Sequence, residues 1–314
     1  MNTVNFKQAI DSNNFEQVKI ALESGTDVNT HFESGFPDIP LLYACDHLYP
    51  KPVAGQIVEL LIGAGASLSS TDKFDHDAMY HAVRKGNIFI VKVLKHYEQT
   101  ISSSCSLLEF MSFRPRHPMM GQRERLQEIL KLLLDEKPDL ELKTDDNNPK
   151  TALHIACKDG FQHEIEMLLM AGSDPNCKDY NNEAPLAYIA NYAWRAHSEC
   201  IFPIYMLVKC GADIDNLGNS SDSETALGWA TMYGGNTLTV VAHLLEHGAE
   251  PNKENNIGET PLIHASRSDR ADLVQILLFF GAKLDHKDKK GKAALDYAIE
   301  RKRDDVVNLL SSYK

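Results

Sequence analysis

The sequence predicts an all-α solenoid of about nine stacked units, each a helix-turn-helix followed by a β-hairpin finger. Three observations predict this fold class. A six-residue segment recurs along the chain, a second motif rich in leucine and glycine follows its copies, and the clearest copies begin 33, 41, 35 and 33 residues apart. Repetition at a fixed period of 20 to 50 residues is the signature of stacked-repeat proteins.

The six-residue segment predicts the first helix of each unit. Its clearest copy is Thr151-Ala-Leu-His-Ile-Ala156. Threonine can cap the start of a short helix, and Leu153 and Ala156, three residues apart, then share one side of it. Further copies are Ala184-Pro-Leu-Ala-Tyr-Ile189, Thr225-Ala-Leu-Gly-Trp-Ala230, Thr260-Pro-Leu-Ile-His-Ala265 and Ala293-Ala-Leu-Asp-Tyr-Ala298.

The second motif predicts the second helix and the finger. Ile165, Leu168 and Leu169 follow the spacing of one helix face. Gly172 stands where the helix needs a left-handed terminator, and Asp174-Pro-Asn176 predicts the turn into the finger. Gly248 and Gly281 occupy the same place in later copies. One such unit cannot bury its apolar faces alone, so neighbouring units must stack.

The repeats predict a single array over residues 1–314, with three atypical units. At the N-terminus Phe6 and Ala9 take the places of the motif's leucine and alanine, and at the C-terminus the last helix is rich in charged residues. The atypical units are an N-terminal capping unit at 1–34, an irregular unit at 97–150 with an insertion at 114–125, and a C-terminal capping unit at 286–314. Pro115 and Pro118 favour an extended insertion over a helix.

Composition excludes several classes of protein. Apolar residues make up 43% and charged residues 24% of the 314 residues, as in folded globular chains. The net charge of 32 − 44 = −12 opposes broad binding to nucleic acid or anionic lipid. The longest apolar stretch, 276–282, is far shorter than the roughly 18 residues of a membrane helix. We expect no Sec-type leader, and six free cysteine thiols in a reducing compartment.

One motif of enzymes appears. His243-Leu-Leu-Glu-His247 fits the His-x-x-Glu-His pattern of a metal-dependent hydrolase, with His243 and His247 as ligands and Glu246 as base. The motif lies inside the repeat, however, where Leu244 and Leu245 are expected in the core. The sequence therefore favours a structural role, no catalytic residues, no metal and no cofactor, and metal analysis distinguishes the two interpretations.

The two motifs, in fixed order and at this period, resemble the ankyrin repeat, which carries Thr-Pro-Leu-His-x-Ala every 33 residues. The resemblance covers essentially the whole chain. It implies a non-catalytic scaffold for protein–protein interaction, which binds through the fingers and the exposed face of the first helices. It also implies that His154, at the family's histidine position, hydrogen-bonds to the backbone of a finger.

The resemblance also implies which residues bind the partner. In the family, the variable surface positions lie seven and eight residues after the signature threonine. Three successive units place Tyr192, Met232, Tyr233 and Arg267 there, and tyrosine and arginine are frequent hot-spot residues. The alternative is partial packing against the next finger. An earlier unit places Arg84 and Lys85 at these positions, where they add positive charge.

The insertion predicts a second contact. The insertion contains four arginines and a single acidic residue, Glu124. The arginines are Arg114, Arg116, Arg123 and Arg125. Guanidinium groups suit recognition of carboxylates, so the insertion is a candidate docking loop for an acidic partner. The alternative is a solvated excursion without a ligand.

We expect one or more protein partners, no nucleic acid, no membrane insertion and a monomer in the cytoplasm. Ankyrin arrays are typical of eukaryotes, and intracellular bacteria also secrete ankyrin-containing effectors. The irregular units and the asparagine, lysine and isoleucine content favour the second source, in which the protein would act on a host protein in the host cytoplasm.

Overall fold

The fold is all-helical over the part of the chain that the computed structural model describes. These are residues 3–33, 37–97, 107–108, 110–112, 122–145, 147–196, 200–219, 223–232 and 237–313, with the backbone alone at 3–5 and 193–196. No β-strand occurs among them. The chain divides into two compact units, Met1–Asp139 and Leu140–Lys314, and each is described by itself.

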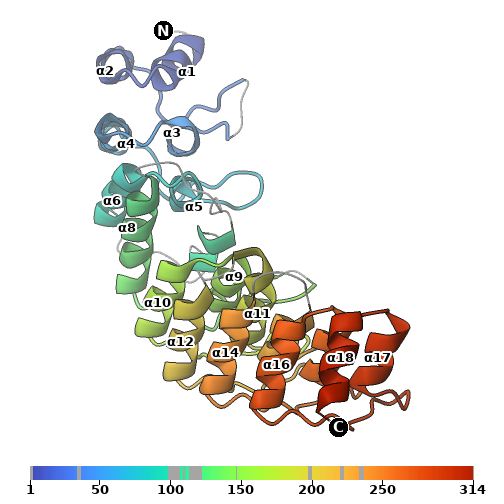
Figure 1. The fold of residues 1–314 in the computed structure, drawn as a ribbon. Helices are drawn as coiled ribbons and strands as arrows, with labels where there is room; N and C mark the ends of the chain where they lie inside the picture. The colour runs from blue at the N-terminus through green and yellow to red at the C-terminus, as the bar shows by residue number, and fades with distance from the viewer. Residues whose placement is uncertain are drawn as a thin grey trace. The chain divides into compact units, whose positions relative to one another are not determined.

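The first unit stacks helices in two layers. Helices α1, α3 and α5 contact one another in order, and so do α2, α4, α6 and α8 (Figure 1). Their bounds are α1 Thr3–Asp11, α2 Phe15–Glu23, α3 Pro40–His47, α4 Pro52–Gly63, α5 Ala78–Arg84, α6 Ile88–Tyr97 and α8 Gln122–Asp135.

The second unit repeats this arrangement. The first helices α9, α11, α13, α15 and α17 form one layer, and the second helices α10, α12, α14, α16 and α18 form the other (Figure 1). Their bounds are α9 Ala152–Asp159, α10 Gln162–Met170, α11 Pro185–Ala196, α12 Ile201–Lys209, α13 Ala226–Met232, α14 Leu238–Glu246, α15 Pro261–Arg267, α16 Ala271–Phe279, α17 Ala294–Glu300 and α18 Asp304–Ser312.

The predicted helix starts agree with the structure. Helices α9 and α15 begin directly after Thr151 and Thr260, and α17 begins after Ala293. Eight helix pairs are complete among the described residues. Helix α8 follows helical residues at 107–108 and 110–112, so its pair is described only in part. The number of nine units and the continuity of one array over 1–314 therefore stay predictions.

Apolar side chains at the repeat positions form the core. Leu153, Ala156, Ile165 and Leu168 are fully buried between α9, α10 and their neighbours. The same positions are buried in other pairs, for example Leu41, Ala44, Ile57 and Leu61, or Leu227, Ala230, Val241 and Leu244. Phe6 and Ala9 are buried as expected for the N-terminal capping unit. Within each of the two units, a helix pair thus completes its core against the next pair.

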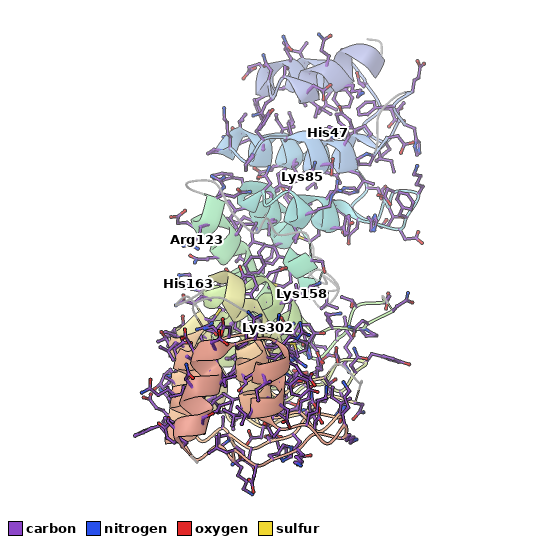
Figure 2. All side chains as sticks on the ribbon, turned by 45° about the vertical axis from the view of Figure 1, so that its right-hand side comes forward. His47, Lys85, Arg123, Lys158, His163 and Lys302 are labelled. Atoms are coloured by element: carbon purple, nitrogen blue, oxygen red, sulfur yellow. The ribbon has the colours of Figure 1, made fainter. Side chains whose placement is uncertain are left out.

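The predicted insertion at 114–125 is partly wrong. Residues 122–125 are the first turn of α8 instead of an extended loop, and Arg123 is labelled there in Figure 2. The helix starts early because Gln122, Arg123 and Arg125 favour helix and continue the spacing of the buried Leu126 and Ile129. The rest of the insertion, residues 114–121, lies outside the described residues.

The described fingers contain no β-strand, so the expected β-hairpins are not confirmed. In the finger at 288–292, the backbone N–H of Asp288 donates to the carbonyl of Lys292 over 3.0 Å. The N–H groups of Lys290 and Lys292 donate to the Asp288 side chain, and the N–H of Gly291 donates to the Asp288 carbonyl over 2.9 Å. The glycine terminators are confirmed, because Gly172, Gly248 and Gly281 have φ of 100°, 93° and 90°.

His154 has the predicted structural role. Its Nε2 donates to the carbonyl of Glu183 in the next finger, over 3.1 Å. Its Nδ1 accepts from the N–H and hydroxyl of Thr151, which forms a capping box at the start of α9. Burial lowers the pKa of His154 to about 4, because desolvation disfavours the charged imidazolium.

We predict that Leu168→Ala lowers the free energy of unfolding by about 2–5 kcal/mol, because it opens a cavity in a core shared by two pairs. Urea unfolding followed by circular dichroism measures the loss. Met170→Ala is the matched control, since Met170 is exposed at the end of the same helix, and it should cost less than about 0.5 kcal/mol. A cost at Leu168 no larger than the control's would contradict a shared core.

We predict that His154 makes stability depend on pH between 6.5 and 4. The folded pKa lies below the unfolded value of 6.5, so the unfolded chain binds more protons and stability falls as pH falls. The parent should lose about 2 kcal/mol more than His154→Gln between pH 7 and pH 5. This variant is a fair control because a glutamine side chain also completes a capping box. Parallel stability curves for the two proteins would contradict the burial of a neutral imidazole.

Candidate interaction surface

Four fingers share one turn, which a side chain at the first position holds. In the finger at 288–292, Asp288 Oδ1 accepts from the N–H groups of Lys290 and Lys292 over 2.9 and 3.0 Å. Asp72, Asp179 and Asn255 hold their fingers through the same two bonds. The four side chains are buried, so the turns are fixed from inside.

The second oxygen of the carboxylate joins the finger to the following first helix. Tyr297 donates its hydroxyl to Asp288 Oδ2 over 2.6 Å, and Tyr188 donates to Asp179 Oδ2 over 2.7 Å. His81 Nε2 lies 3.2 Å from Asp72 Oδ2. Sequence reasoning missed these contacts. Their signal is an aromatic ring or histidine nine residues after the finger aspartate, one position beyond the family's histidine.

Asparagines join neighbouring fingers. Asn176 donates to the carbonyl of Gly211 over 2.8 Å and accepts from the N–H of Asp213 over 2.7 Å. Asn29 and Asn252 make the same pair of bonds to the next finger. The last residue of the second motif is therefore a bridge between units, which explains why the motif ends in a short polar side chain.

The predicted stripe in the second unit is partly packed. Tyr192 is half-buried, and its ring covers Gly160, where an added Cβ would lie 2.3 Å from a ring carbon. Met232 is also half-buried, and its carbonyl accepts from the Ser268 hydroxyl over 2.9 Å. Tyr233 lies outside the described residues. Tyr192 thus packs in part against Gly160 at the end of α9, in the preceding helix pair and not in the next finger.

Arg267 is tied into a buried ionic cluster. Its guanidinium donates to Glu259 over 2.8 Å and to His264 Nδ1 over 2.9 Å, and its side chain is 26% exposed. His264 is fully buried, and its Nε2 lies 3.0 Å from Glu224. Much of the Arg267 charge is thus compensated inside the protein.

Glu224 also explains an exception in the first motif. Gly228 stands at the family's histidine position, and a Cβ there would lie 2.3 Å from a Glu224 carboxylate oxygen. The small residue leaves room for this buried carboxylate. The cluster around His264 and the glycine at 228 are therefore two parts of one local arrangement.

In the first unit, Arg84 and Lys85 surround Asp46. Lys85 Nζ lies 3.2 Å from the carboxylate, Arg84 donates to it, and His81 Nδ1 lies 3.2 Å away. Figure 2 labels His47 and Lys85 at this place, at the ends of α3 and α5. Burial raises the pKa of Asp46, but the hydrogen bonds from His81 and Arg84 and the nearby cations outweigh it and hold this pKa well below its usual range.

The His-x-x-Glu-His motif at 243–247 lies at the end of α14. His247 Nδ1 donates to the backbone carbonyl of His243 over 2.8 Å, so the helix end uses one of its ring nitrogens. Within the described ranges, no group of three or more histidine, cysteine, aspartate or glutamate side chains is placed to hold a metal ion. Arg114 and Arg116 lie outside those ranges.

A groove of about 900 Å³ lies between α2 and α4 in the first unit. Its lining mixes apolar and charged side chains, among them Phe15, Leu22, Leu60 and Glu59. None of the sequence-predicted binding residues lines it. Over the described part of the chain, no helix has both the length and the apolar character to cross a bilayer.

Comparisons with known proteins agree with the repeat geometry. The chain is 27% identical to human Inversin over 162 residues, which are 51% of this chain and 14% of Inversin. It is 29% identical over 176 residues to a putative ankyrin repeat protein of Acanthamoeba polyphaga mimivirus, and 24% identical over 262 residues to one of Fowlpox virus. These cover 55% and 83% of this chain, and 41% of each viral protein.

The chain therefore spans less than half the length of these relatives. The family model described as ankyrin repeats (3 copies) matches residues 120–215, 164–255, 191–288 and 227–314. These matches together cover residues 120–314, more than half of the chain. With the stacked helix pairs and the finger geometry, they show that this chain belongs to the ankyrin-repeat family.

Proposed function

We propose that the chain is a non-catalytic protein-interaction module, which binds its partner through the fingers and the exposed part of the first helices. One observation carries the proposal: large apolar side chains stand exposed on fingers that buried side chains hold in place. Phe74, Tyr180 and Ile257 are 61%, 77% and 37% exposed. Exposed apolar groups on a fixed frame offer contact area at a small cost in entropy.

The first-helix face supports the same proposal. The finger with Tyr180 leads directly into α11, which carries Tyr192, and the finger with Ile257 leads into α15, which carries Arg267. The proposed contact comprises these fingers with the half-exposed parts of Tyr192 and Met232, and Tyr233. Arg84, Lys85, Arg114 and Arg116 would act mainly by long-range attraction of an acidic partner, because rim charges change on-rates more than off-rates.

A contact that resembles a catalytic pair favours the non-catalytic proposal. Cys177 Sγ lies 3.6 Å from His154 Nδ1. Burial raises the pKa of the Cys177 thiol to about 12 and lowers that of His154 to about 4. A thiolate and an imidazolium cannot then coexist near neutral pH, so this pair lacks an activated nucleophile.

We further propose that the module works as a monomer in the cytoplasm. The five described cysteines are free thiols, which suits a reducing compartment. The second candidate, a bacterial effector that binds a host protein in the host cytoplasm, would use the same surface. The two differ in the source of the partner and not in the binding chemistry.

We predict that changing both Tyr192→Ala and Tyr233→Ala weakens partner binding by about 2 kcal/mol or more, as expected of hot spots. The partner is first captured by a pull-down with the intact chain and identified by mass spectrometry. Isothermal titration calorimetry then compares affinities. Phe279→Ala is the matched control, because Phe279 is an exposed aromatic residue on α16, in the layer of second helices. Its affinity should equal that of the parent.

The thermal unfolding midpoint of the double variant distinguishes a role of the two tyrosines in partner binding from a role in packing. We expect the double variant to unfold near the parent's midpoint, because the Tyr192 ring is only half-buried. A folded variant with unchanged affinity would contradict the first-helix contact. A large fall in the midpoint would mean that the two tyrosines serve packing, which contradicts it as well.

A further inference from the structure

The finger at 283–292 carries a concentrated positive charge on an acidic protein. Its ten residues include five lysines and two aspartates, whereas the whole chain has a net charge of −12. The five lysines are Lys283, Lys287, Lys289, Lys290 and Lys292. We propose that this finger, with Ile257 beside it, is a docking site for a short acidic peptide segment of a protein partner. This inference rests on the proposed function, since it names the class of partner for one finger.

The aspartates do not cancel this charge. The Asp288 side chain is buried, and its two oxygens accept from the backbone of Lys290 and Lys292 and from Tyr297. Burial raises the pKa of Asp288, but these hydrogen bonds outweigh it and lower the pKa overall. The carboxylate therefore stays ionised but is used inside the turn, and Asp285 is the exposed acidic group of the finger.

Two lysines have partners and three are open to solvent. Lys292 pairs with Glu300 at 2.6 Å, and Lys289 Nζ donates to the carbonyl of Asn256 over 2.8 Å. Lys283, Lys287 and Lys290 are exposed, and no ion pair of theirs is seen among the described residues. Three ammonium groups on one finger are therefore available to carboxylates of a ligand.

An apolar contact lies beside the lysines. The N–H of Lys289 donates to the carbonyl of Ile257 over 3.2 Å, so the exposed Ile257 side chain belongs to the same surface. His286 Nε2 donates to the carbonyl of Gly258 over 2.9 Å and joins the two fingers from the other side. A ligand with carboxylates around one apolar residue matches this arrangement.

A short peptide fits better than a long polyanion. Charges interact over about 10 Å at 0.1 M salt, so a segment of a few residues senses the finger more than the acidic remainder of the chain. A nucleic acid or an anionic membrane extends much further and meets the net charge of −12. The positive charge of the finger therefore attracts a short acidic segment, while the negative charge of the whole chain repels a long polyanion.

Fluorescence anisotropy with the full chain tests this proposal. The probe is fluorescein-labelled Glu-Glu-Leu-Glu-Glu-Glu, and the reference is the same peptide with glutamine for every glutamate. We expect saturable binding of the acidic probe at about 50 mM salt and an affinity at least about fivefold lower at about 300 mM salt. The reference peptide should show no saturable binding. The double variant Lys287→Glu with Lys290→Glu should bind the acidic probe with an affinity at least about tenfold lower than the parent's.

The control changes the net charge by the same amount on other helices of the second unit. Lys158 and Lys209 are exposed near the ends of α9 and α12, and Lys158→Glu with Lys209→Glu should change the affinity less than about twofold. Absence of saturable binding of the acidic probe, equal binding of the glutamine peptide, or an equal loss in the control would overturn the proposal. Tighter binding of a thymidine 20-mer or of phosphatidylserine vesicles would overturn the peptide class.

Failure of the finger proposal can be distinguished from failure of the proposed function. If the acidic peptide does not bind but binding of the captured partner still depends on Tyr192 and Tyr233, only the finger inference is wrong. If no protein is captured by the intact chain, the proposed function is wrong, whatever the peptide does.

Discussion

A buried side chain at the start of four described fingers is the interaction on which the rest of this structure depends. Asp72, Asp179, Asn255 and Asp288 each accept from two backbone N–H groups of their turn, and the three aspartates also contact a ring of the next first helix. Buried polar groups are costly unless they are hydrogen-bonded, so these turns keep one conformation. The fingers can then hold exposed aromatic and charged residues in fixed positions.

The stacked frame also decides which charges remain for a partner. Arg84 and Arg267 were expected on the surface from their places in the repeat, but each pairs with a buried carboxylate, Asp46 or Glu259. Lys287 and Lys290, which the repeat pattern did not single out, stand exposed on the last finger. Position in a repeat therefore locates the surface, while the contacts across units determine its charge.

The sequence predicts the helices well because the signals are local. Threonine caps, leucine spacing and terminal glycines act within one unit, and each recurs. The contacts between Glu224 and His264, or Asp46 and Arg84, join residues 40 and 38 positions apart and depend on the register of stacking. The contacts of Asp179 and Asp288 with Tyr188 and Tyr297 likewise depend on how each finger lies against the following first helix. The early start of α8 could have been predicted from the helix propensity of residues 122–125. The two prolines, Pro115 and Pro118, led instead to the expectation of an extended insertion over all of 114–125.

Hydrogen exchange of the finger amides tests the central claim that buried side chains hold the fingers. In the parent, the N–H groups of Lys290 and Lys292 should exchange slowly although they lie in a turn at the surface, because both donate to Asp288. In Asp288→Ala these two amides should exchange much faster, while the Glu183 amide, which Asp179 holds in another finger, should keep its rate. Slow exchange of all three amides in the parent, with acceleration confined to the altered finger in the variant, is the result that the account predicts. Exchange at unprotected rates for these amides in the parent would contradict it.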